Sequence, residues 1–269
     1  MRPRLVRWLM LLCATSVSGC LSPRVPASPA RELSVYDLMS EPVSPNERYY
    51  VILFASQATP RVPSRSHTWA TAIKVTQVPD GAPRIETHTI SWLPDSMNVR
   101  WWKLTVEPGS NFSNEFSIEY ALKTGQRVSA WGPYEIWPGL YKRFVVQKAF
   151  LDSDAIGYQC TDAIGEAARL GNGCDCFHAI SDMDPFLDRG SYPLRYFGDR
   201  ATLNIVRQLQ TRPTLINPGV THDWLFGALG LDRYPICRRR YDGRSVEFSP
   251  EAALDYVNRR EGKSARAKH

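Results

Sequence analysis

The feature that most restricts the fold is a pair of alternating, β-branched runs separated by a short turn signal. Residues 67–78 (HTWATAIKVTQV) and 84–92 (RIETHTISW) both alternate between the two faces of a strand, and Asp80-Gly81 lies between them. This pattern predicts an antiparallel hairpin. A turn centred on Asp80-Gly81 pairs residues whose numbers sum to about 161, so His88 is expected opposite roughly Ile73. Such a hairpin needs helices or a second sheet to cover it.

The rest of the chain changes from strand-like to helix-like patterns. The apolar run 49–55 predicts a buried strand, 101–106 a further strand, and 234–241 a late strand. Helical periodicity and end signals predict helices over 111–123, 138–151, 162–170, 176–183, 201–210 and 222–229. The predicted class is α+β, with an antiparallel sheet in the first half packed against the helices of the second half.

The N-terminus has the layout of an export signal. Basic residues precede the short apolar run 8–14, and small residues lead to Cys20. The stretch 17–20 (VSGC) resembles the bacterial lipobox, which implies that residues 1–19 are a signal peptide and that Cys20 is lipidated. By resemblance to Gram-negative lipoproteins, Leu21 after this cysteine implies sorting to the outer membrane. We therefore expect an exported protein with a membrane partner, anchored through Cys20.

Proline content and charge divide the remainder. Residues 20–46 are proline-rich and predict a spacer, 47–247 a single α+β domain, and 248–269 a C-terminal helix with a basic tail. The formal net charge is +6, but the basic residues gather at the two ends. Residues 32–256 carry a small acidic excess, which argues against a nucleic-acid partner.

Four cysteines lie within the predicted domain, and they allow two interpretations. Cys160, Cys174, Cys176 and Cys237 could form two disulfides in an oxidising compartment. Alternatively, Cys176 begins a helix capped by Asp175. In that position the helix dipole lowers the pKa of a thiol and makes it a nucleophile. Cys174 is the alternative nucleophile.

A thiol nucleophile needs a base, and the chain has five histidines. His67 opens one hairpin strand and His88 lies within the other. The predicted register places them about six positions, or roughly 20 Å, apart along the ladder. Either one alone could still face the cysteine. His222 and His178 are the alternative bases, although His178, two residues after Cys176, is also typical of a packed histidine.

The order of these motifs resembles the circularly permuted branch of papain-like enzymes, which includes NlpC-type and lecithin retinol acyltransferase-like proteins. The matching segments are 66–69 (SHTW), 87–89 (THT) and 176–178 (CFH), within about 67–185. The resemblance implies a nucleophile at Cys176, a base at His67 and an orienting residue at His88. It also implies a cysteine hydrolase or acyltransferase, without a cofactor, acting on peptide amide or acyl bonds of peptidoglycan or acyl-lipid substrates. The sequence departs from the family pattern where Asp175 replaces the asparagine before the cysteine.

Two other classes remain open. Cys174, Cys176 and His178, with His67 or His88, offer ligand types for a metal, although the spacing is not a common zinc spacing. A non-enzymatic binding or structural lipoprotein with disulfide-bonded cysteines is the other alternative. Several tryptophans lie along residues 92–137. They favour a core, but a binding role gains weight if several of them line a groove at the surface.

Overall fold

A five-stranded sheet forms the centre of the domain. The computed structural model describes residues 28–33, 41–186 and 197–244. The strand order is β3-β2-β1-β6-β9, and only the β6–β9 pair is parallel. The strands are β1 (Glu47–Gln57), β2 (Ser66–Thr76), β3 (Arg84–Ile90), β6 (Arg127–Ile136) and β9 (Ile236–Arg239). The α+β class and the mostly antiparallel sheet are confirmed.

The predicted hairpin is present as β2 and β3. His88 pairs with Ala72, one residue from the predicted partner, and Ile73 pairs with Thr87. The apolar run 49–55 forms most of β1, which lies between β2 and β6 and is almost entirely buried. A strand with neighbours on both edges and layers on both faces can be apolar throughout, which accounts for its continuous hydrophobic run.

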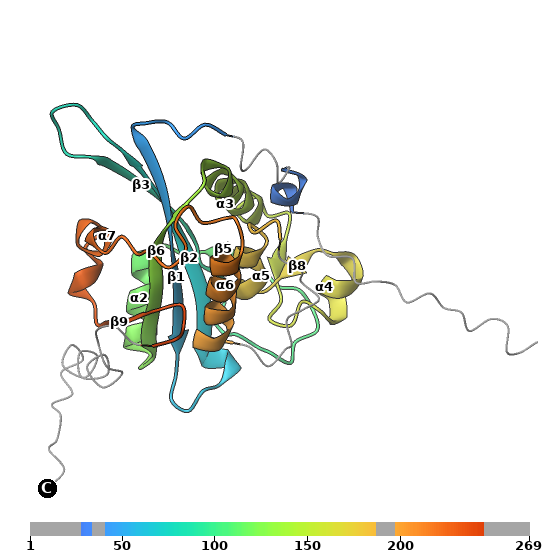
Figure 1. The fold of residues 1–269 in the computed structure, drawn as a ribbon. Coiled ribbons are helices and arrows are strands. Elements are labelled where there is room, and N and C mark those ends of the chain that lie inside the picture. The colour runs from blue at the N-terminus through green and yellow to red at the C-terminus, as the bar shows by residue number, and fades with distance from the viewer. Residues whose placement is uncertain (1–27, 34–40, 187–196, 245–269) are drawn as a thin grey trace, which may run out of the picture.

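Helices cover both faces of the sheet. Figure 1 shows α3, α5 and α6 on one side and α2 and α7 on the other. The helices are α2 (Asn114–Lys123), α3 (Pro138–Leu151), α4 (Gly165–Leu170), α5 (Cys176–Ser181), α6 (Asp199–Thr211) and α7 (Trp224–Ala228). Short 3-10 turns occupy Pro29–Glu32, Pro63–Arg65 and Leu231–Arg233. None of the helices in the described ranges is long and apolar enough to span a membrane.

Two small ladders lie beside the main sheet. Antiparallel β4 (Trp92–Pro94) and β5 (Gly109–Asn111) follow the hairpin. Parallel β7 (Gly157–Tyr158) and β8 (Gly173–Cys174) hold together the segments before α4 and α5. This second ladder positions the candidate site.

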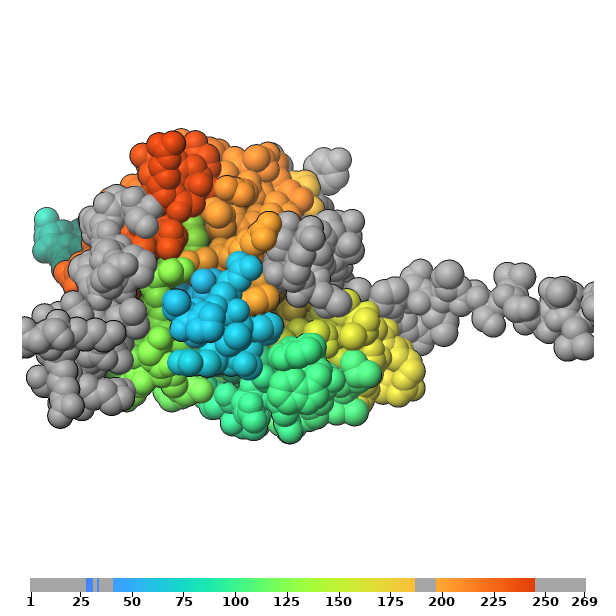
Figure 2. Space-filling model, turned by 90° about the horizontal axis from the view of Figure 1, so that it is seen from below, coloured from blue at the N-terminus to red at the C-terminus, as the bar shows by residue number. Residues whose placement is uncertain are grey.

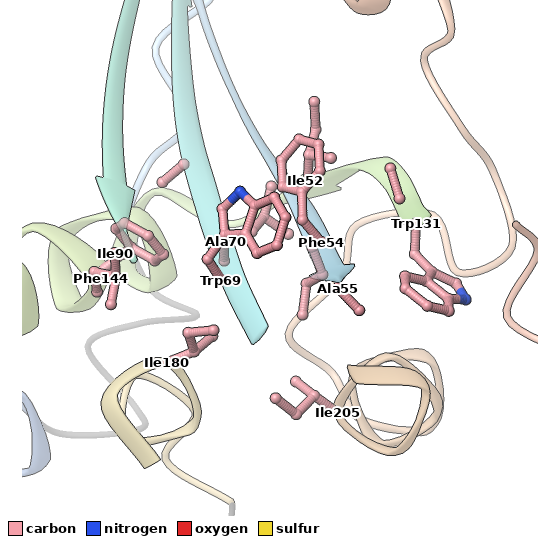
Figure 3. Packing of buried hydrophobic residues seen from close by; sticks show 14 of the residues in the cluster. Ile52, Phe54, Ala55, Trp69, Ala70, Ile90, Trp131, Phe144, Ile180 and Ile205 are labelled. Carbon is pink, nitrogen blue, oxygen red and sulfur yellow. The ribbon is translucent and has the colours of Figure 1, made fainter. Parts of the chain in front are cut away.

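Apolar side chains fill both interfaces between sheet and helices. On one face Phe54 and Trp69 stack with their ring centroids 5.3 Å apart. On the other face Ile180 of α5 and Ile205 of α6 point toward the strands, as Figure 3 shows. Because neighbouring residues of a strand project to opposite faces, β2 contributes Trp69 to the first interface and Ala70 to the second.

One predicted strand is absent, and one strand of the structure was not predicted. Residues 101–106 form a turn at Trp101 and Trp102 followed by irregular chain, and both tryptophans are exposed. The strand β6 was not predicted, although residues 127–136 are nearly all buried. Gly132 and Pro133 interrupt its pattern and coincide with a register shift in the β1–β6 pairing. The predicted signal peptide (1–19) and terminal helix (248–269) lie outside the described residues.

Candidate functional site

Helix α5 begins at Cys176, as the sequence predicts. The side chain of Asp175 caps it, since its carboxylate accepts a hydrogen bond from the backbone N–H of His178 at 2.7 Å. The helix packs against β2 close to Thr68, and the backbone N–H groups of Thr68 and of Cys176 itself face the sulfur. Strand β3 pairs with β2 only from Ala70 onward. The edge of β2 at residues 66–69 is therefore open, and α5 can approach Thr68 there.

Cys176 opens into a pocket of about 510 Å³. The apolar walls include Val99, Trp101, Trp102, Leu104, Ile164, Phe177 and Phe197, and the polar groups include Tyr158, Cys160, Asp162, Asp175, Cys176 and His178. In Figure 2 segments that line it meet on one face: cyan residues before β2, green residues after β4 and yellow residues around α4. The pocket therefore combines a mostly apolar wall with a cluster of titratable groups.

The titratable cluster comes from two parallel segments that run in register. Tyr158 pairs with Cys174 in the β7–β8 ladder, and these residues are sixteen positions apart in the sequence. Further along, the carboxylate of Asp162 lies 2.7 Å from Nδ1 of His178, again sixteen positions apart. Asp162 and Tyr158 were not among the predicted site residues. The available signal was the density of titratable side chains in 158–162 (YQCTD) and 174–178 (CDCFH).

His178 is held as an imidazolium between two carboxylates. Its Nδ1 lies 2.7 Å from Asp162 Oδ2 and 3.2 Å from Asp175 Oδ1. Burial lowers the pKa of His178, but Asp175 and Asp162 outweigh it and raise the pKa to about 10. The side chain is therefore protonated at neutral pH, and in that state it cannot accept a proton from a thiol.

The thiols at this site have raised pKa values. Burial, and then the charge of Asp175, raises the pKa of Cys160 to about 12 and that of Cys176 well above its ordinary value. The predicted lowering of the Cys176 pKa is therefore wrong for this arrangement. The N–H groups that face the sulfur do lower the pKa. A six-residue helix with a carboxylate at its N-cap offers too little positive potential to offset burial.

His67 lies on the opposite face of β2 from Cys176. Its Nε2 is 2.8 Å from the hydroxyl of Ser91, which is 2.7 Å from that of Ser117 on α2. Burial lowers the pKa of His67 to about 3, so the ring is neutral. The predicted approach of His67 to Cys176 is not observed, because His67 projects toward α2 and it is the neighbouring Thr68 that projects to the other face, where it contacts Thr202 of α6.

The structure does not bring His88 or His222 to the thiol either. His88 shares the α3 side with Cys176, but it pairs with Ala72, four residues or about 13 Å along β2 from Thr68. Its ring contacts Tyr141, and its Nε2 is 3.0 Å from Glu86. His222 packs against Tyr50, on the face opposite Cys176. His178 is the predicted base that shares the pocket with Cys176.

The remaining cysteines lie elsewhere in the packing. Cys174 is buried in β8 next to Trp92, whose indole N–H donates to the Cys174 carbonyl at 3.2 Å. Cys237 is buried in β9. No disulfide joins any two of Cys160, Cys174, Cys176 and Cys237, which are the cysteines of the described ranges.

The group best placed to hold a cation differs from the set suggested by the sequence. Ligand atoms of Asp162, Asp175 and His178 lie within 4.8 Å of one another. Cys174 and Cys176 do not belong to this group, and neither His67 nor His88 reaches it. The protonated His178 already pairs with both carboxylates, and one net negative charge is left on the cluster.

No family model, curated protein or solved structure matches the chain.

Proposed function

We propose that this protein is an exported, outer-membrane lipoprotein, anchored through Cys20, whose α+β domain binds a neutral acyl ligand in the pocket beside α5. The observation that carries this proposal is the exposed aromatic and aliphatic wall of that pocket. Trp101 and Trp102 are 51% and 60% exposed, and Leu104 and Ile164 line the same pocket. Contiguous apolar surface around a cavity is typical of a binding site.

The geometry of this wall supports a chain-like apolar ligand. The rings of Trp101 and Trp102 meet edge to face with centroids 5.7 Å apart. Both tryptophans lie in the segment after β4, and neither ring is buried in the interior of the domain. Exposing these rings to water costs hydrophobic free energy. A bound acyl chain would recover about 25 cal/mol per Å² of apolar surface that it buries.

The charge of the polar cluster supports a neutral ligand. One imidazolium, His178, faces two carboxylates, Asp162 and Asp175. The cluster is therefore net negative, and it repels the carboxylate of a free fatty acid. The carbonyl of an ester or amide can instead accept hydrogen bonds from uncharged donors such as the Cys160 or Cys176 thiol.

Calorimetric titration tests this preference. The full chain would be titrated with glycerol monododecanoate and with dodecanoate, below the micelle concentration of each. We expect the ester to bind at least about tenfold more tightly, because only the acid places a charge beside Asp175. Equal affinities, or no binding of the ester, would refute the proposed ligand class.

Thiol-dependent hydrolysis or acyl transfer is the second candidate, within a permuted papain-like arrangement. Supporting it are a helix that begins at Cys176 and the pair His178–Asp162 in the same pocket. In this mechanism the Cys176 sulfur attacks an acyl or peptide carbonyl, and the Cys176 N–H stabilises the oxyanion. The mechanism requires His178 to lose its proton first, so a bound substrate must separate it from Asp162 or Asp175.

Turnover assays decide this second candidate. Acyl esters and peptidoglycan peptides would be incubated with the full chain, the Cys176→Ser variant and the Cys237→Ala variant. Cysteine catalysis predicts hydrolysis that Cys176→Ser abolishes and Cys237→Ala preserves. Absence of turnover in the wild-type protein, together with ester binding, leaves the binding function alone.

A further inference from the structure

We propose that Cys160 and Cys176 form a reversible disulfide across the floor of the pocket. The proposal goes beyond ligand binding and does not depend on it. It rests on two contacts that flank these cysteines, the β7–β8 ladder before them and the Asp162–His178 contact after them, and on the pocket that both cysteines line.

The register is fixed on both sides of the pair. Before the cysteines, Gly157 pairs with Gly173 and Tyr158 with Cys174, and the N–H of Gln159 donates to the Cys174 carbonyl at 3.2 Å. After them, Asp162 and His178 meet at 2.7 Å. Cys160 and Cys176 occupy matching positions between these two contacts. Cys160 lies in a turn and Cys176 begins α5, but the contacts on either side hold the two segments together, and both cysteines act electrostatically on the same group, Tyr158. A disulfide requires their Cα atoms to lie about 4.4–6.8 Å apart.

Both cysteines are accessible to a small oxidant through the pocket that they line. Cys160 and Cys176 are half-buried thiols, and both line the pocket. Each lies close to Asp175 and Tyr158, and the charge on Cys160 is felt at Cys176. Cys174, by contrast, is fully buried on the far side of Asp175, and Cys237 lies in β9 at the edge of the main sheet.

The exchange needs only a small disulfide as the oxidant. The thiolate of either cysteine attacks the S–S bond of oxidised glutathione, and one glutathione thiolate leaves. The second cysteine gives its proton to solvent, and its thiolate then attacks the mixed disulfide, releasing the second glutathione. Two protein S–H bonds are lost, one S–S bond forms, and the oxidant is reduced to two thiols.

The surroundings do not stabilise the reduced form as a thiolate. Burial and the Asp175 carboxylate both raise the pKa values of the two thiols. Dithiol sites that are strong oxidants have a stabilised reduced form, and this site lacks the thiolate stabilisation that would supply it. The bond would also remove Cys176 from any thiol chemistry while leaving the wall formed by Trp101 and Trp102 in place.

Peptide mapping tests the pairing. The full chain would be equilibrated with oxidised glutathione, alkylated in denaturant and digested with trypsin. Cleavage after Lys148, Arg169 and Arg189 places Cys160 in peptide 149–169 and Cys176 in peptide 170–189. We expect these peptides to be joined, with fragmentation locating the bond at Cys176 and not at Cys174.

Variants and melting temperatures provide the controls. Cys160→Ser and Cys176→Ser should each abolish the joined peptides, whereas Cys174→Ala should retain them. Oxidation should raise the Tm of the wild-type protein by roughly 6–12 °C, because a bond between cysteines sixteen positions apart restricts the unfolded chain. It should not raise the Tm of Cys160→Ser. Alkylation of both Cys160 and Cys176 after oxidation, or a bond from Cys160 to any other cysteine, would overturn the proposal.

Discussion

His67 and Cys176 lie on opposite faces of β2. The His67 ring stacks on Trp69 and bonds to Ser91 on the α2 side, while the Cys176 sulfur meets the backbone of Thr68 on the α5 side. The histidine is neutral and the thiol is protonated. Because the strand separates them, each group is expected to titrate and react according to its own surroundings.

Acid should destabilise the protein through His67. The pKa of its ring is about 3 in the folded protein and near 6.5 when unfolded, so the unfolded state binds the extra proton between these values. The free energy of unfolding therefore falls as pH drops below 6.5, and the contribution of His67 to this loss is on the order of 3 kcal/mol at pH 4. Urea unfolding of wild type and His67→Gln at pH 7 and pH 4 measures this. Equal pH dependence in the two proteins would show that His67 is not buried neutral.

Cysteine alkylation should be slow in the native state. Thiolate is the reacting form, and burial and Asp175 raise the pKa of both pocket thiols. At pH 7 iodoacetamide should label Cys160 at least about tenfold more slowly in the native protein than in urea. Cys176 should also be labelled more slowly in the native protein. Mass spectrometry of the peptides gives the rates. Faster native labelling of Cys176 would instead indicate an activated nucleophile.

His178 should titrate far above the normal range for histidine. Its pKa of about 10 exceeds the unfolded value, so its stabilising effect is complete below about pH 6.5 and is lost as pH rises through 10. Asp162→Asn should lower this pKa and destabilise the protein by a few kcal/mol at neutral pH. NMR titration of the ring measures the first effect. The surface substitution Asp154→Asn is the control, and an unchanged His178 midpoint in Asp162→Asn would contradict the assignment.

The β7–β8 ladder should depend on small residues. A Cβ at Gly157 would lie 2.3 Å from Val106 Cγ1 and 2.7 Å from the Glu107 carbonyl oxygen. Gly157→Ala should therefore destabilise the protein by about 1–3 kcal/mol. Gly81→Ala, at the exposed hairpin turn where the nearest atom would be 3.5 Å away, should change stability little. Chemical denaturation compares the two, and equal losses would argue against close packing at Gly157.

Local patterns in the sequence predicted the elements better than their contacts. The hairpin follows from alternation and Asp80-Gly81, and its register is one residue from the prediction. The start of α5 follows from Asp175 and Cys176. Strand β6 was missed because Gly132-Pro133 resembles a turn, although here it accompanies a register shift within the sheet.

The contacts of the site depend on information that single segments do not carry. The order of the motifs predicts that His67 lies near Cys176. The face of β2 from which the His67 ring projects, however, depends on which helices cover each face of the sheet. The meeting of Asp162 with His178 depends on the parallel register of β7 and β8, two strands of two residues each. Segments 158–162 and 174–178 are both rich in titratable residues, but only the folded ladder brings the two segments together.

Quenching of tryptophan fluorescence by a bromine-labelled acyl ester tests the central claim most directly. The probe is a glycerol monoester of 12-bromododecanoic acid, which quenches only the indoles that it contacts. We expect saturable quenching in the wild-type protein and in Trp224→Ala, whose indole is 48% exposed outside the pocket. The Trp101→Ala/Trp102→Ala double variant should lose most of it. No saturable quenching in the wild type, or equal quenching in the double variant, would contradict binding at this pocket.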